Sequence, residues 1–451
     1  MTVQRFIISI VPRWFVGVFS VLTFLSSGAQ TSILYPEDIF TELRPLLETA
    51  IDSASSLEKK RWVSREREAQ SLSADAQNQM RIYLNARMIT GYESRTDDVE
   101  NRSTATVNSN FSVSKPLYYW GALDDIAESR ALLKDASDFD YAESLRAHLN
   151  QVRKTYMEWS LSRRQLEILD ENAVLAAQFV ENQRKLFEAG QQSEQSILEM
   201  EVRLQSTDEQ RAQLDRDIGW LREQLIILVG DEERVDQLEG LSFPEFEMMT
   251  ETEISELKTA LEKIGLSTPM LERESLYAEA EAKYADSIEK RHRPNLDMVA
   301  GLFTDRIDAA NSSDSAYRFG GYAGVEVRWN IFDGNRDRGE RMAAMARKRQ
   351  REYSKIEAAA YLNGQAERTL AELKYIVRQV QTRTTQVDLL ARRLKLAETP
   401  EASGLIAPID LLELRLDYLN AQQAILVSRV DYLINLTNLA AMYYDDPVGG
   451  V

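Results

Sequence analysis

Cysteine is absent from the 451-residue sequence, and histidine occurs only at His148 and His292. Without cysteine the chain has no disulfide bonds and no thiol chemistry, and no cysteine follows a signal sequence to carry a bacterial lipid anchor. His148 falls on a predicted helical face, and His292 stands between Arg291 and Arg293 in the other half of the chain. We therefore expect both histidines to be surface or packing residues, with no catalytic residue, no metal site and no cofactor.

Long hydrophobic runs are missing beyond residues 1–29. Within that segment Arg5 and Arg13 give a positive start, an apolar stretch covers 14–25, and small residues follow at 27–29. This pattern is typical of a cleaved secretory signal peptide, and an N-terminal membrane anchor is the alternative. Because no later apolar run reaches about 18 residues, we expect no transmembrane helix. A membrane role would have to be made by strands.

The chain also lacks an excess of positive charge, since its formal net charge is −18. Loss of the two arginines with the signal peptide would leave −20 (−18 minus 2). Such an acidic surface argues against nucleic acid as a partner. The glycine-rich stretch 320–324 lacks the Lys-Ser/Thr of a phosphate loop, and no catalytic triad is recognisable. We expect a protein that is not an enzyme.

The sequence is built from two copies of one unit. A constant offset places the second half on the first without a gap for most of its length, with Asn330 on Pro116 (330 − 116 = 214) and Gly404 on Gly190 (404 − 190 = 214). Identity between the halves is low, but the phase of the pattern is kept. Each half is predicted to contain a helix, two strands joined by a loop, and two very long helices, so the halves are copies of one supersecondary unit.

This repeat predicts a mainly α-helical fold with a β-barrel part. We expect a signal peptide at 1–29, a first structural repeat at 30–235, an equatorial segment at 236–268, a second repeat at 269–444 and a tail at 445–451. The predicted strands are 81–92, 105–116, 295–304 and 318–331, and the predicted coiled-coil helices are 121–188, 193–229, 336–398 and 408–443. The pieces outside the repeats, including 34–54, are expected to form a belt around the long helices.

The strands are predicted from strict alternation of apolar and polar residues. The first strand has apolar residues at even positions, and its counterpart in the second half keeps this phase: Ile82, Leu84, Ala86 and Met88, then Leu296, Met298, Ala300 and Leu302. In the last strand, Val325 and Val327 are expected on the apolar face and Glu326 on the polar face. About 9–11 tilted residues cross a bilayer. Two soluble β-hairpins on a helical protein are the alternative.

Aromatic residues gather at both ends of these strands and predict two interfacial girdles. The girdle on the helix side consists of Tyr118, Tyr119, Trp120, Trp329 and Phe332. Four strands cannot close on themselves, and an open sheet edge is not tolerated in lipid. If these strands span a membrane, the strands of several chains must therefore form one barrel together.

The long helices are predicted from the absence of helix breakers. The segment 122–188 contains neither proline nor glycine and corresponds to a helix of roughly 100 Å. Apolar residues recur every seventh position from Leu145 to Phe187, which is typical of helices packed side by side with a left-handed supercoil. Gly190 and Gly404 are expected at the tips of the helical hairpins, because glycine adopts the left-handed conformation of a helix end.

Three segments, in this order, resemble the TolC-type outer membrane efflux proteins of Gram-negative bacteria. They are Arg293-Pro294-Asn295-Leu296, where helix turns into strand, then Trp329-Asn330-Ile331-Phe332-Asp333-Gly334, and Gly404 to Glu413. The first half departs from the pattern at Met80 and at Tyr119-Trp120. The resemblance covers essentially the whole mature chain. It implies a homotrimer with a twelve-stranded outer-membrane barrel, four strands per chain, above a periplasmic α-helical barrel.

The resemblance also implies a function and sites. A periplasmic adaptor (membrane fusion) protein and an inner-membrane pump would dock at the hairpin tips, at Gly190, Gln191, Gly404 and Leu405. Asp410 and Glu413 share a helix face and match acidic positions that narrow the periplasmic entrance in some members. The alternative is that these acids are a solvated first helical turn, which the helix dipole favours. Ile406 replaces a basic residue that latches neighbouring helices in some members.

The resemblance thus predicts a passive export duct of a tripartite efflux or type I secretion system in the outer membrane, in contact with its lipid. A periplasmic adaptor or structural protein made of coiled-coil hairpins is the second hypothesis. A porin-like receptor is the third, although loops of about a dozen residues offer little binding surface. The sequence does not identify the substrate or the pump.

Overall fold

The computed structural model describes residues 34–93, 102–190, 193–238, 244, 246–264, 268–308, 315–398, 408–443 and 446–449. The predicted signal peptide and the predicted tip residues Gln191, Gly404 and Leu405 lie outside the described residues. Among the described helices, none combines the length and the apolar character that a membrane crossing requires.

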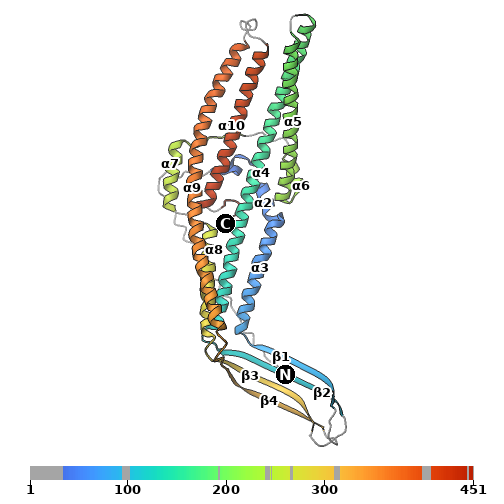
Figure 1. Cartoon of the computed structure of the whole chain (residues 1–451), viewed down its shortest axis with the longest axis vertical. Helices are drawn as coiled ribbons and strands as arrows, with labels where there is room; N and C mark the ends of the chain where they lie inside the picture. The colour runs from blue at the N-terminus through green and yellow to red at the C-terminus, as the bar shows by residue number, and fades with distance from the viewer. Residues whose placement is uncertain are drawn as a thin grey trace, which may run out of the picture. The chain divides into compact units, whose positions relative to one another are not determined.

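Helices dominate the described chain, and a single four-stranded sheet accompanies them (Figure 1). The helices are α1 Pro36–Ile39, α2 Leu43–Ser53, α3 Ser55–Asp75, α4 Ala122–Glu188, α5 Glu194–Val229, α6 Glu232–Asp236, α7 Glu251–Ile264, α8 Pro269–Lys290, α9 Arg336–Ala397 and α10 Pro408–Tyr443, with a 3₁₀ turn η1 at Ala76–Asn78. The strands are β1 Arg81–Glu93, β2 Arg102–Tyr118, β3 Asn295–Asp308 and β4 Ser315–Arg328. The predicted mainly helical fold with four strands per chain is confirmed.

The duplication is visible in the positions where elements begin. The pairs α3 and α8, β1 and β3, α4 and α9, and α5 and α10 each begin at the offset found in the sequence, as in 336 − 122 = 214 for α4 and α9. In each half a helix leads into two strands, and a very long helix leaves the sheet and returns through a second helix (Figure 1). The two halves are therefore copies of one helix–strand–strand–helix–helix unit.

The long helices pack side by side, and α4 is in contact with α3, α5, α8 and α10. The main hydrophobic core lies where the long helices meet the short helices α2 and α7. It contains Leu47, Tyr156, Leu225, Leu257, Leu373 and Leu436, all nearly inaccessible to solvent. Each buried leucine contributes about 1.5–3 kcal/mol on burial, so the short segments are firmly attached to the long helices.

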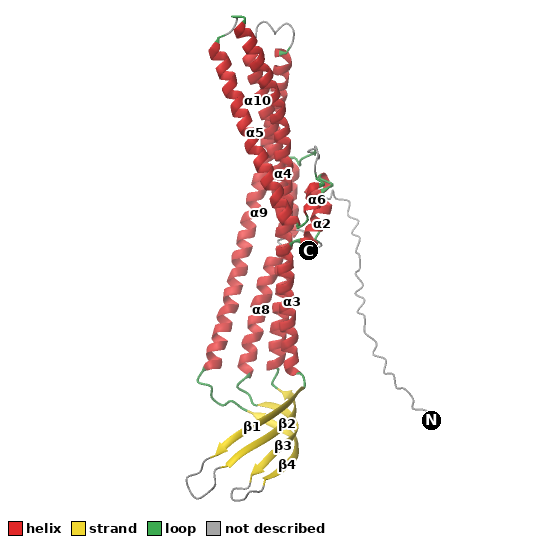
Figure 2. Ribbon diagram, turned by 90° about the vertical axis from the view of Figure 1, so that its right-hand side faces the viewer, coloured by secondary structure: helices red, strands yellow, loops and turns green. Residues whose placement is uncertain are grey.

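The four strands form one antiparallel sheet in the order β1-β2-β3-β4 (Figure 2). Its register places Leu84 opposite Phe111 and Phe111 opposite Leu302, so apolar residues of three strands share one row. On the next pair, Met298 faces Val325 and Leu296 faces Val327, while Glu326 faces Asp297 on the other side of the sheet. The alternation expected from the sequence is therefore that of a sheet with one apolar and one polar face.

The turns from sheet to helix have the same backbone form in both halves. Trp120 and Gly121 have φ of 59° and 79°, and their repeat equivalents Gly334 and Asn335 have φ of 73° and 68°. Glycine thus stands second in one turn and first in the other. Positive φ in a bulky residue is strained, and the indole N–H of Trp120 compensates by donating to the Pro294 carbonyl at 2.9 Å.

An ion cluster joins the two ends of the described chain to α4. The guanidinium of Arg153, fully buried on α4, donates to Glu37 at 2.7 and 2.9 Å and to Asp446 at 2.6 and 3.0 Å. Burial favours the neutral form of Asp446, but the hydrogen bonds from Arg153 prevail and lower the pKa of this carboxyl below its usual range. We call Arg153, Glu37 and Asp446 the Arg153 cluster.

Candidate functional site

The first hairpin tip is described up to Gly190. This glycine follows α4 with φ of 71°, and its N–H donates to the Phe187 carbonyl at 2.8 Å. Nothing within 4 Å would meet a Cβ at this position, so the backbone conformation alone calls for glycine. The role of Gly190 in docking a partner stays a prediction.

The two acids of the predicted gate lie at the start of α10. Pro408 is the first residue of this helix, Asp410 lies in its first turn, and both Asp410 and Glu413 are exposed. Proline is well suited to this place because the first helical N–H has no partner within the helix. The sequence placed these carboxylates on one face, and their spacing of three residues within a continuous helix agrees with that placement.

Arg203 of α5 is a member of this site that the sequence reasoning missed. Its guanidinium forms an ion pair with the carboxylate of Glu413, across 210 positions of sequence. Within the described ranges Asp410 forms no ion pair. An exposed pair of this kind adds at most about 1 kcal/mol to stability, so its main effect is on charge. Arg203 compensates Glu413 and leaves Asp410 as the uncompensated acid.

A small apolar cluster explains why Arg203 reaches α10. Val180 of α4 and Met200 of α5 are buried together, and Leu416 of α10 packs against them. This contact lies one helical turn from the Arg203–Glu413 pair, and it joins the hairpin of the first half to the returning helix of the second.

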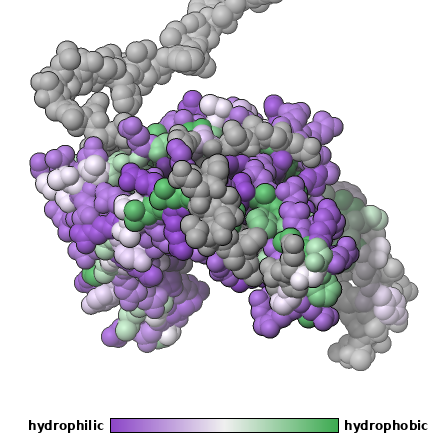
Figure 3. All heavy atoms as spheres, turned by 90° about the horizontal axis from the view of Figure 1, so that it is seen from above, coloured by the Kyte–Doolittle hydropathy of each residue, from purple (hydrophilic) through white to green (hydrophobic). Residues whose placement is uncertain are grey.

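The space-filling view in Figure 3 shows that the residues seen from above are mostly hydrophilic, with small separate apolar areas.

The predicted girdle residues lie where the sheet meets the helices, and three of them hydrogen-bond there. The Tyr119 hydroxyl donates to the Asp297 carboxylate at 2.9 Å, while the indoles of Trp120 and Trp329 donate to backbone carbonyls of the turn between α8 and β3. Burial raises the pKa of Tyr119, and the adjacent Asp297 adds to the effect. The remaining two, Tyr118 and Phe332, are exposed. Lipid contact by this set stays a prediction.

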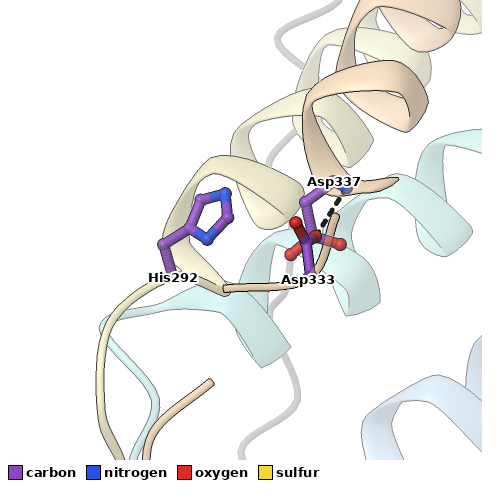
Figure 4. A group of neighbouring side chains, drawn as sticks. All are labelled: His292, Asp333 and Asp337. Carbon is purple, nitrogen blue, oxygen red and sulfur yellow. Dashed lines mark hydrogen bonds between the residues drawn. The ribbon is translucent and has the colours of Figure 1, made fainter. Parts of the chain in front are cut away.

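A second group of side chains, also located where the sheet meets the helices, was not predicted from the sequence. His292, which we expected to be a surface or packing residue, lies beside Asp333 of the β4–α9 turn and Asp337 of the first turn of α9 (Figure 4). One ligand-type atom of each residue lies within 4.8 Å of the others. The 41 positions between His292 and Asp333 hide this proximity in the sequence (333 − 292 = 41). The pairing of β3 with β4 and the packing of α8 against α9 bring the two turns together.

Comparison with known proteins identifies the family. The family model described as outer membrane efflux protein matches residues 46–231 and 262–443, which is more than half of the chain. No curated protein matches the sequence.

Several solved structures have the same fold at low identity. The outer membrane protein VceC from Vibrio cholerae is 15% identical, with a TM-score of 0.74 over 90% of this chain and 98% of that chain. The CmeC outer membrane channel of Campylobacter jejuni is 14% identical, with a TM-score of 0.75 over 92% and 89%. The open state of the MtrE outer membrane channel of Neisseria gonorrhoeae is 15% identical, with a TM-score of 0.70 over 93% and 94%. These structures share the fold of this chain, and the match to the family model shows that the chain belongs to the outer membrane efflux protein family, as a protein of the Gram-negative outer membrane.

Proposed function

We propose that this chain is the exit duct of a tripartite efflux or type I secretion system. In this proposal the duct conducts substrates passively from a periplasmic adaptor–pump complex to the exterior, and it catalyses no reaction. The observation that carries the proposal is the sheet, whose apolar face is exposed and whose outer strands β1 and β4 each have one paired edge in the described chain. Such a sheet is incomplete both in water and in lipid.

A homotrimer would complete this four-stranded sheet. Three sheets of four strands each would give twelve strands, with β4 of one chain pairing with β1 of the next, and closure would leave no free edge. The apolar face, which includes Leu84, Phe111, Leu302 and Val325, would then meet lipid. The polar face would line the lumen, and the girdle residues would lie at the membrane boundary on the helix side.

The helical part supplies the periplasmic section of the proposed duct. The two repeats, 30–235 and 269–444, would each contribute one hairpin of long helices to its wall, with 236–268 and the tail 445–451 on its outside. The hairpin tips at Gly190 and Gly404 would receive the adaptor protein. Asp410 and Glu413 from three chains would form two rings of carboxylates at the entrance, where such rings favour cations.

The Arg203–Glu413 pair changes the charge of that entrance. If each Glu413 is compensated by Arg203 of the same chain, as in this structure, three Asp410 carboxylates carry the uncompensated charge. The proposed gate is therefore a ring of Asp410 with an outer set of ion pairs. Multivalent cations applied from the periplasmic side should bind mainly to Asp410.

Cross-linking in outer membranes tests the proposal. Because the chain contains no cysteine, one can be placed on β1 and one on β4 without a background of native thiols, for example Leu84→Cys with Gly321→Cys, Ala323→Cys or Val325→Cys. A pair in register should give a covalent trimer in the outer-membrane fraction, and the matched single variants should not. A water-soluble monomer recovered from the periplasm would contradict the duct and favour the coiled-coil adaptor hypothesis.

A further inference from the structure

Two turns at the helix side of the sheet bring a histidine and two carboxylates together. His292 lies in the turn between α8 and β3, Asp333 in the turn between β4 and α9, and Asp337 in the first turn of α9. Figure 4 shows the imidazole on one side and the two carboxylates on the other. All three candidate ligand atoms lie within 4.8 Å of one another.

Asp337 has a buried carboxylate oxygen without a hydrogen bond. Its side chain is only 3% exposed, and its Oδ1 accepts no hydrogen bond. The nearest cations are Arg336 Nη2 at 3.5 Å and Arg291 Nη1 at 3.9 Å. A buried charged oxygen without a hydrogen bond is costly, and such atoms normally have a partner or hold an ion. Asp337 Oδ1 thus has two arginines at ion-pair distance but no hydrogen bond, and it can still accept a closer cation.

The other two residues, Asp333 and His292, are held in position and can still bind a cation. Each oxygen of Asp333 accepts one backbone N–H, from Asn335 at 2.9 Å and from Asp337 at 2.8 Å. A carboxylate oxygen has a second lone pair, so both oxygens still have room for a cation. The carbonyl of His292 accepts the Trp329 indole at 2.9 Å, which holds the backbone of this residue, and its ring is exposed.

The first repeat shows that the turn itself does not need these side chains. The equivalent positions in that repeat are Asn78, Tyr119 and Leu123 (292 − 214 = 78). That turn has the same pair of left-handed residues and leads into α4 in the same way. The turn itself therefore does not require the histidine or the buried acid of the second repeat.

We propose that His292, Asp333 and Asp337 bind a divalent first-row transition cation, with water completing its coordination. One imidazole nitrogen and two carboxylate oxygens suit Zn²⁺ and related ions. Ligand atoms at about 2.0–2.1 Å from a tetrahedral ion stand about 3.4 Å apart, so distances of up to 4.8 Å in the cluster must shorten by up to about 1.4 Å. Rotation of the exposed His292 ring supplies this movement. The ion would join the α8–β3 turn to the start of α9.

The two arginines compete with such an ion for Asp337. Arg291 already donates to Glu340 at 2.9 Å, and the Arg336 side chain is 64% exposed and can turn into solvent. Binding of the ion would displace Arg336 from Oδ1. Removal of the Arg336 guanidinium should therefore increase the affinity for the cation, an effect that a purely structural role of Asp337 would not produce.

Zn²⁺ titration of the intact protein tests the site. The full chain, purified without a polyhistidine tag, is titrated with Zn²⁺ by calorimetry and, in parallel, with Co²⁺ by visible absorption. Asn78→Ala is the matched control, because Asn78 occupies the position of His292 in the first repeat. We expect one ion per chain in the wild type and in Asn78→Ala. Loss of a hydrogen-bond partner of a metal ligand weakens binding about 10–100-fold, so His292→Ala and Asp337→Asn should weaken it by more than about 100-fold.

The outcomes separate the site from its alternatives. Tighter binding in Arg336→Ala, together with loss in His292→Ala, supports the proposal even if Asp337→Asn folds poorly. Absence of binding to the wild type overturns it. Binding that is unchanged in His292→Ala overturns it as well, because the ion would then be held by other surface acids. None of these readouts depends on transport, so the test is independent of the duct proposal.

Discussion

Replacement of Arg153 by methionine should be among the most destabilising single changes in the helical part. Arg153 is fully buried and is the shared partner of Glu37 and Asp446, both of which are also buried. Methionine fills a similar volume but leaves two buried carboxylates without a cation. Loss of one partner of a buried ion pair costs about 3–5 kcal/mol, and the presence of two orphaned acids places Arg153→Met at the upper end of that range.

The matched controls separate charge from packing. Arg153→Met/Glu37→Gln/Asp446→Asn removes all three charges and with them the cost of leaving two buried carboxylates without a cation. The triple variant should therefore regain most of the loss. Lys185→Ala removes a surface ion pair with Glu181, both side chains being more than half exposed, and should cost less than about 1 kcal/mol.

The penalty of Arg153→Met should depend on pH. Because the folded-state pKa of Asp446 is lowered, the stabilisation from this acid is complete above its unfolded value of about 3.9 and is lost as the pH falls through the folded pKa. As the pH falls through the folded pKa of Asp446 the wild type loses this stabilisation, so wild type and variant should converge. Hydrogen exchange of α1, α2 and the middle of α4 reports the opening of this region. Equal exchange in Arg153→Met and wild type at neutral pH would refute the reasoning.

Two further predictions concern the proposed gate and the sheet. Asp410→Ala should weaken block of single-channel conductance by multivalent cations more than Glu413→Ala, and Arg203→Ala should strengthen it; unchanged block in an assembled trimer would mean that these acids form only a solvated first turn. On β4, Val325→Arg should cost about 2–4 kcal/mol in lipid if its position lies near the bilayer centre, whereas Glu326→Arg on the opposite face should be tolerated. The shift of the folded band on unheated gels measures both variants, and equal effects would contradict the two-faced sheet.

The fold was accessible from the sequence because its determinants are periodic. The helix α4 was expected over 121–188 and runs from Ala122 to Glu188. Its 67 residues include neither proline nor glycine, so nothing in the sequence interrupts the helix. Strand alternation likewise depends only on parity, and a shift by one residue would turn every apolar side chain to the wrong face. The constant offset between the two repeats then carried each assignment from one half to the other.

The contacts of the site were not accessible in the same way. Arg203 and Glu413 are partners because Leu416 brings α10 against the first hairpin, and no local pattern records a contact across 210 positions. The Arg153 cluster is a similar case, since its acids come from the two ends of the described chain. Ion pairs that form through tertiary packing show no periodic pattern in the sequence. The sequence therefore indicated the gate acids but not the arginine that pairs with one of them.

The differences between the repeats carry more functional information than their agreement. Where the halves agree, they describe a scaffold, such as the two left-handed residues before α4 and α9. Where they differ, charge has been added to one copy only: Asp410 stands at the position of Ser196, and Asp337 at the position of Leu123. At these two positions a scaffold role is already satisfied by the uncharged residue of the first copy. For these two acids we propose a cation at both places, a mobile one at the entrance and a bound one beside the sheet.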